Sequence, residues 1–243
     1  MIKIENVDIY GWEAAIRGMR NPMNSWSKSD SNFDFPDCFS CPHNGEDTVV
    51  SCLPYNCVVL GKNDLKLMKT LSKAGSDHGK FLRMITVTLD ITAPLYWWKE
   101  FDTYKVGTVA NSCSTMHKIH AKEFTLDDFS HEHLYGIDDY PMTLNFNNTE
   151  LTFKSSPLGC LEITVGLLNH FRQQYLDTKD KKYWWQMIQL LPSSYNQKRT
   201  VQLNYQVLKS MYFARKNHKL DEWREFCSWC ETLPYFKEVC LDA

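Results

Sequence analysis

Two stretches of the chain alternate between apolar and polar residues in the way that is typical of half-buried β-strands. One is residues 1–10. The clearer one is residues 85–91, where polar residues separate the apolar positions Ile85, Val87, Leu89 and Ile91. The sequence therefore predicts strands in both places.

Apolar residues three or four positions apart predict helices over much of the remaining chain. We expect Asn63 to be the N-cap of one of them and Pro94 to open another. In the C-terminal half, Val201, Tyr205, Leu208 and Tyr212 share one helical face. The expected helices cover about 11–22, 63–75, 94–101, 126–129, 161–176, 199–214 and 220–232.

The composition is that of an ordinary globular protein and sets limits on the function. The 243 residues suit a single domain, which we expect to carry a Cys-rich loop at about 34–60 and a hairpin-like excursion at about 138–157. A formal net charge of −2 gives no global argument for nucleic-acid binding. No apolar run resembles a secretory signal or a membrane span, and the nine cysteines are an odd number, so we expect a cytoplasmic protein without a disulfide framework.

A cluster of four cysteines has spacing that can bind a metal ion. Cys38 and Cys41 form a Cys-x-x-Cys pair, and Cys52 and Cys57 follow with a looser spacing. Four thiolates can surround a structural zinc ion and leave no open coordination position. Four ordinary thiols in a surface loop explain the cluster equally well. A further pair, Cys227 and Cys230, lies on a predicted helix and is expected to be buried.

The stretch YKVGTVANSCSTMHK, at 104–118, collects groups that suit a phosphate or the edge of a nucleobase. Lys105 supplies a positive charge, Asn111 can both donate and accept hydrogen bonds, and Ser112 and Ser114 carry hydroxyls. Gly107 permits a tight turn. Taken alone, these residues fit a polar strand and turn better than a reactive site.

Two segments of the chain resemble flavin-dependent thymidylate synthases of the ThyX type. The first, DHGKFLRMITVTLDITAPLYWWKEFDTYKVGTVANSCS, contains the family's AP pair and a counterpart of its R-H-R-x-x-S-x-N-E-x-S signature, with Asn111 and Ser114 at the matching positions. The second begins at LLPSSYNQK. It places Asn204 and Arg215 at the spacing of the family's asparagine and nucleotide-binding arginine, with His218 following. Together they cover about half of the chain.

The sequence departs from the family pattern mainly by losing charge. Tyr104, Lys105 and Val106 stand in place of the R-H-R triplet, so only Lys105 keeps a positive charge. The signature glutamate is replaced by Ser112, and the earlier signature serine by Val109. After Phe81, where the family often has a glutamate, the chain has Leu82 and Arg83.

The resemblance implies an α+β fold with an antiparallel sheet flanked by helices, assembled as a homotetramer. It also implies methylation of dUMP to dTMP with methylenetetrahydrofolate and reduced FAD, which NADPH regenerates. It assigns substrate binding to Arg215, Ser114, Ser112 and Lys105. It assigns flavin binding to Asn204, His218, Asn111 and His78. Two alternatives are a nucleotide-binding module without methyl transfer and an interaction protein that uses a zinc-bound cysteine loop.

Overall fold

A computed structural model describes residues 2–33, 58–140, 142–146 and 149–242, which form two compact units. The larger unit comprises the described residues of 2–91, 100–111 and 199–242. The smaller unit comprises those of 92–99 and 112–198. The predicted zinc ligands Cys38, Cys41, Cys52 and Cys57 lie outside the described residues.

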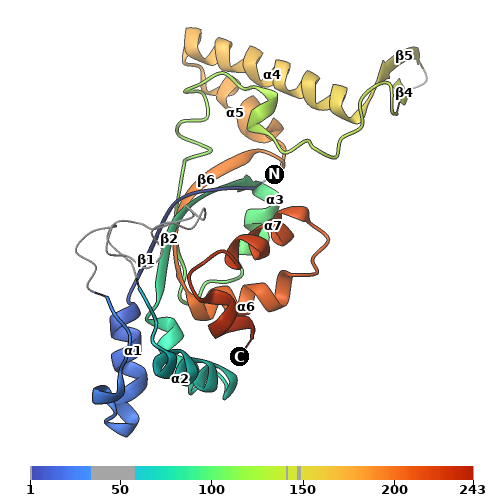
Figure 1. The fold of residues 1–243 in the computed structure, drawn as a ribbon. Helices are drawn as coiled ribbons and strands as arrows, with labels where there is room; N and C mark the ends of the chain where they lie inside the picture. Colours follow the sequence, from blue (N-terminus) through green and yellow to red (C-terminus); the bar gives the residue numbers. More distant parts are fainter. Residues whose placement is uncertain (1, 34–57, 141, 147–148, 243) are drawn as a thin grey trace, which may run out of the picture. The chain divides into compact units, whose positions relative to one another are not determined.

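The structure contains a four-stranded sheet with the strand order β1-β2-β6-β3 (Figure 1). Its strands are β1 (Lys3–Tyr10), β2 (Thr86–Pro94), β6 (Asn196–Asn204) and β3 (Val109–Ser112). Pairing of β2 with β6 is antiparallel, because Thr200 Oγ1 donates to Asp90 while the Tyr205 amide donates to the Ile85 carbonyl. Val87, Leu89 and Ile91 are buried, which confirms the strand predicted at this position.

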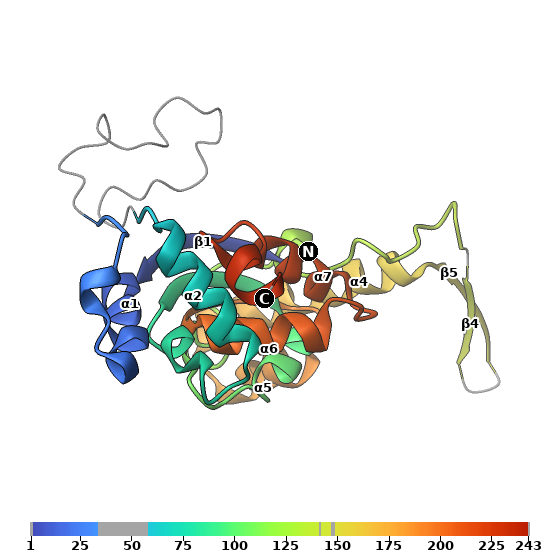
Figure 2. The same cartoon turned by 60° about the horizontal axis from the view of Figure 1, so that its bottom comes forward.

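Helices cover the strands of the larger unit because each has an apolar stripe to bury. In α1 (Trp12–Arg20), which lies where a helix was expected, the buried residues include Trp12, Ala15, Ile16 and Met19. Figure 1 shows α6 (Tyr205–Arg215) and α7 (Asp221–Cys230) on one side of β1, β2 and β6. A short 3-10 helix, η4 (Gly79–Arg83), packs against α1, α2 (Lys62–Lys73) and α6, and Figure 2 views this end of the unit. The remaining short elements are α3 (Leu95–Phe101), η1 (Asn21–Met23), η2 (Trp26–Lys28) and the π-helical η6 (Lys237–Leu241).

The smaller unit has its own apolar core beneath two helices. The long α4 (Pro157–Thr178) packs against α5 (Lys181–Leu190). The short η5 (Leu126–Asp128) begins with a capping box between Thr125 and Asp128. Strands β4 (Met142–Phe146) and β5 (Thr149–Ser155) pair antiparallel, which confirms the predicted hairpin. The core consists of Ile119, Phe124, Phe129, Leu161, Leu168 and Met187.

Two predicted helix starts are wrong. The helix expected over 199–214 is two elements, because β6 continues to Asn204 and α6 begins only at Tyr205. Asn63 is not an N-cap, because α2 begins at Lys62. The Asp30 carboxylate, from outside the helix, accepts the amide hydrogens of Asn63 and Asp64 instead.

Within the described part of the chain, no helix is long and apolar enough to cross a membrane. Among these residues, no three His, Cys, Asp or Glu side chains gather as metal ligands would. Cys227 and Cys230 are buried on α7, as predicted, and burial raises the pKa of Cys227 to about 11. Such thiols are inert at neutral pH.

Candidate functional site

A cavity of about 610 Å³ in the larger unit joins three segments that are far apart in sequence. This volume is within the range of about 300–1,000 Å³ that is usual for small-molecule sites. The 103–107 loop provides one wall, the start of α6 a second, and η4 contributes Arg83. We call it the α6 pocket; it is lined by Arg83, Thr103, Tyr104, Lys105, Val106, Gly107, Asn204, Gln206, Val207 and Ser210.

The α6 pocket is suited to an anion. Arg83 and Lys105 bring two positive charges, and none of the described residues that line it is acidic. The first turn of α6 also faces it, and a helix N-terminus carries a partial positive charge. The Tyr205 and Val207 amides of this turn already donate to Ile85 and Asn204, so the charge rather than these amides is what the turn offers. Tyr104 adds an aromatic ring. Cations, a helix N-terminus and a ring together are groups that can bind the phosphate and base of a nucleotide.

Asn204 and Gly107 fix the geometry of this pocket. As the N-cap of α6, Asn204 accepts the Val207 amide hydrogen through its side-chain oxygen at 3.0 Å. Gly107 has a φ of 76°, and a Cβ atom placed there would lie 3.1 Å from Asn204 Nδ2 and 3.3 Å from Val207 Cγ2. The loop can therefore approach α6 this closely only because residue 107 is glycine.

Replacing Gly107 with alanine is expected to lower both the stability of the protein and the affinity of the α6 pocket for an anionic ligand. The positive φ alone costs about 1–2 kcal/mol in a residue with a Cβ atom, and the contact with Asn204 adds to this. Gly75→Ala is the matched control, since Gly75 has a φ of 101° but open space around its Cβ position. Thermal unfolding and ligand titration of both variants give the measurement. Equal ligand affinities in the two variants would contradict the prediction.

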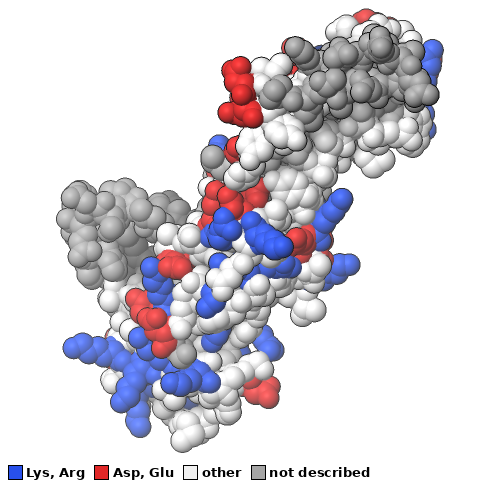
Figure 3. Space-filling view, turned by 90° about the vertical axis from the view of Figure 1, so that its right-hand side faces the viewer, with Lys and Arg blue, Asp and Glu red and all other residues white. Residues whose placement is uncertain are grey.

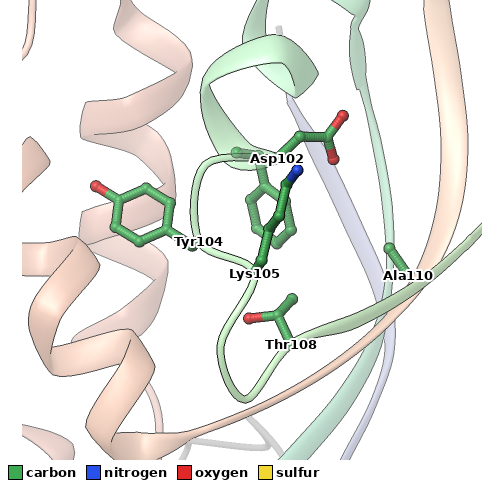
Figure 4. Close-up of a pocket in the computed structure, with 6 residues that line it drawn as sticks. Asp102, Tyr104, Lys105, Thr108 and Ala110 are labelled. Atoms are coloured by element: carbon green, nitrogen blue, oxygen red, sulfur yellow. The ribbon is translucent and has the colours of Figure 1, made fainter.

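A second cavity, of about 320 Å³, shares Tyr104 and Lys105 with the α6 pocket. Figure 4 shows Lys105 extending beside Asp102 and the Tyr104 ring turned away to the other side of the loop. The Asp102 carboxylate accepts from Arg199 Nη1 at 2.7 Å. Thr108 Oγ1 is buried here and has no hydrogen-bond partner among the described residues. Lys105 therefore stands between two cavities.

Arg215 lies in a neighbouring cluster of the same unit and its charge is already neutralised. Its Nη1 atom donates to Glu100 at 2.6 Å and its Nε atom donates to the Tyr104 hydroxyl at 2.9 Å. The guanidinium also lies over the Trp223 ring, 4.9 Å from its centroid. Glu100 accepts from Trp223 Nε1 as well, and His218 Nε2 lies 3.3 Å from the same carboxylate oxygen. We call these residues the Glu100 cluster: Glu100, Tyr104, Arg215, His218 and Trp223.

The structure brings some of the predicted site residues together and leaves others apart. Lys105 and Asn204 line one pocket, while Arg215 and His218 meet at Glu100. His78 precedes η4 and is exposed, and Asn111 is exposed on β3. Ser112 and Ser114 belong to the smaller unit, where Ser114 accepts two amide hydrogens and lines a separate cavity with Cys113.

Neither the sequence pattern nor the resemblance assigns a role to Arg83, Glu100 or Gln206. Arg83 had one local signal, its position after Phe81 where the family often has the opposite charge. Glu100 and Gln206 had none, because their partners come from distant segments. A cavity lined by three separated segments has no signature in the periodicity of any one of them.

Solved structures with the same fold come from enzymes that bind nucleotides. One is the crystal structure of ThyX from Helicobacter pylori with FAD and dUMP, with a TM-score of 0.61, 13% sequence identity, and coverage of 100% of this chain and 98% of that chain. Another is the UMP/dUMP methylase PolB from Streptomyces cacaoi bound with 5-Br dUMP, with a TM-score of 0.58, 13% identity, and coverage of 98% and 94%. No protein-family model and no curated protein matches the sequence. The chain therefore has the ThyX fold, and the predicted α+β class with an antiparallel sheet is confirmed.

Proposed function

We propose that this chain is a flavin-dependent methylase that acts on a pyrimidine nucleoside monophosphate, with dUMP as the first candidate. The observation that carries the proposal is the α6 pocket. It places Lys105 and Asn204, which the resemblance assigns to substrate and flavin, in one cavity with Arg83 and a helix N-terminus. The likeness of the whole fold to the two nucleotide-binding enzymes supports the same conclusion.

The residues present fit a group that carries phosphate and a flat ring. The cations Arg83 and Lys105 and the partial positive charge at the start of α6 suit the phosphate, and the Tyr104 ring and Val207 offer apolar contact. The Asn204 side-chain oxygen is used by the helix cap, so its amide nitrogen is the group that faces the 103–107 loop. When bound, reduced FAD would supply the hydride for the methyl transfer, and the protein would bind and orient both partners. The folate donor and the homotetramer stay predictions.

Absorbance spectroscopy and product analysis test the proposal. The purified chain is mixed with FAD, with and without dUMP, and desalted, and its spectrum is recorded. Retained flavin absorbance, followed by formation of dTMP from dUMP, methylenetetrahydrofolate and NADPH, is the expected result. An apoprotein that retains no flavin in the presence of dUMP would overturn the methylase proposal.

One observation favours a second function, nucleotide binding without methyl transfer. The positions that match charged or polar signature residues of the family hold Val106 and Val109, which are 91% and 65% exposed. Valines this exposed add little packing and no charge to the site. Stabilisation of the protein by dUMP without any retained flavin would indicate this function.

Replacing Val106 with arginine is expected to tighten nucleotide binding. Val106 lines the α6 pocket and is almost fully exposed, so the change adds a cation at little cost in stability. An exposed ionic contact is worth about 0.5–1 kcal/mol, which is roughly two- to fivefold in Kd. Val109→Arg is the matched control, because Val109 is exposed but does not line this pocket. Calorimetric titration gives the Kd of each variant for dUMP. Equal changes in Kd would show that added positive charge acts through the overall charge of the protein and not through the α6 pocket.

A further inference from the structure

The ion pair of Arg215 with Glu100 already compensates the positive charge that a ligand would need. Its side chain is 19% exposed and satisfies Glu100 and Tyr104 at hydrogen-bond distance. A phosphate that took over the Nε and Nη1 donors of Arg215 would displace Tyr104 and Glu100. The Glu100 carboxylate would then keep Trp223 and His218 as its partners in this cluster. Since the removal of one partner from a partly buried ion pair is costly, the Glu100 cluster opposes this displacement.

Arg83 and Lys105 are in the opposite situation. Both side chains are exposed and line the α6 pocket, and neither forms an ion pair with any residue that the structure describes. Arg83 is placed by η4, whose Phe81 and Leu82 are buried and whose packing against α6 directs it to the start of that helix. A guanidinium held on a packed element can form two parallel bonds with a phosphate.

The chain that leads to Arg83 is rich in basic residues. Residues 62–83 contain six Lys or Arg residues and two Asp residues, and one of these, Asp64, is buried in an ion pair with Arg20. On the face drawn in Figure 3, basic side chains gather at the lower end, where α1 and α2 lie. Positive potential around a pocket raises the local concentration of anions and speeds their binding.

From these contacts we infer that Arg83, together with Lys105, binds the nucleotide phosphate, and that Arg215 is a positioning residue that holds Tyr104. This inference rests on the proposed function and names the phosphate-binding group of its site. It reassigns a role that the resemblance gives to Arg215. The phosphate belongs to dUMP or to the flavin nucleotide, since the same cations suit both.

The test compares ligands with and without phosphate in matched variants of the full chain. Titrations use dUMP against deoxyuridine, and FAD against riboflavin, with wild type, Arg83→Ala, Lys80→Ala and Arg215→Ala. Lys80 is exposed on the same η4 helix and does not line the pocket, so it controls for general charge. Thermal unfolding of each variant separates loss of binding from loss of folding.

We expect Arg83→Ala to weaken dUMP or FAD binding about tenfold while deoxyuridine or riboflavin binding stays unchanged. If the effect appears with dUMP and deoxyuridine, the phosphate is that of the substrate; if it appears with FAD and riboflavin, the phosphate is that of the flavin nucleotide. Lys80→Ala is expected to change Kd less than twofold. Arg215→Ala is expected to lower the unfolding temperature and to keep the preference for the phosphorylated ligand. Loss of that preference in Arg215→Ala but not in Arg83→Ala overturns the inference and leaves the proposed function standing. If dUMP binding depends on Arg83 but no dTMP is formed, the proposed methylase activity is overturned and the inference about Arg83 stands.

Discussion

Replacing Asp64 with alanine is expected to destabilise the protein by about 3–5 kcal/mol, because it leaves the buried Arg20 charge unpaired. The two side chains are 0% and 4% exposed, and Arg20 Nε donates to Asp64 at 2.7 Å. The other carboxylate oxygen accepts four hydrogen bonds from Ser29, Asp30 and Ser31. Urea unfolding at neutral pH measures the loss.

Arg17→Ala is the matched control for this prediction. Arg17 lies one turn earlier on α1, and its pair with Glu13 is exposed on both sides, so its removal should cost less than about 0.5 kcal/mol. A loss for Asp64→Ala no larger than that of the control would show that the buried pair adds nothing to stability.

The effect of Asp64 should also depend on pH in a defined direction. Burial alone would raise the pKa of Asp64, but hydrogen bonds from Ser31, Ser29 and Arg20 outweigh burial and lower it from its ordinary value of 3.8. A group with a depressed folded-state pKa stabilises the protein above its unfolded pKa, and this stabilisation is lost as the pH falls through the folded-state value. The difference between wild type and Asp64→Asn should therefore stay constant from pH 7 to 5 and shrink below about pH 4.

The sequence predicts the regular elements well where one period of apolar residues stands alone. In β6 and α6 two periods overlap at Val201, which belongs both to the strand alternation with Leu203 and to the helical series with Tyr205 and Leu208. The helical series is the longer of the two, so the sequence predicts a helix over residues that form the end of β6. Asn204 sets the boundary between strand and helix, because its side chain accepts the Val207 amide hydrogen and caps the start of α6.

Contacts between distant segments limit how much of the candidate site can be predicted from the sequence. The local pattern shows a resemblance to the family signature, a turn at Gly107 and the residues Lys105 and Asn204, which do share a pocket. The partner of Arg215 is 115 residues away, so its neutralisation by Glu100 could not be seen in the sequence. Asp30 capping α2 is the same kind of contact across an intervening segment. Side chains that meet only after folding change which residue is available to bind a ligand.

Replacing Trp223 with alanine is expected to cost about 3–5 kcal/mol of stability, as removal of a large buried aromatic side chain usually does. Trp223 is fully buried, donates to Glu100 at 3.1 Å, and packs edge-on against Phe226 and Tyr104. Trp223→Phe keeps a ring beneath Arg215 and removes the hydrogen bond to Glu100, so it should cost only about 1–2 kcal/mol. Chemical unfolding of both variants gives the comparison.

The milder of these variants, Trp223→Phe, also separates a positioning role of Arg215 from ligand binding. If Arg215 holds Tyr104 while Arg83 binds the phosphate, Trp223→Phe should shift the affinity for dUMP and deoxyuridine by the same factor, because only the shape of the pocket beside Tyr104 changes. Charge recognition would then be untouched, and the ratio of the two Kd values would stay that of wild type. If a folded Trp223→Phe protein loses affinity for dUMP but not for deoxyuridine, the phosphate binds at the Glu100 cluster. The reason is that Trp223 contacts the cation Arg215 and its partner Glu100 there.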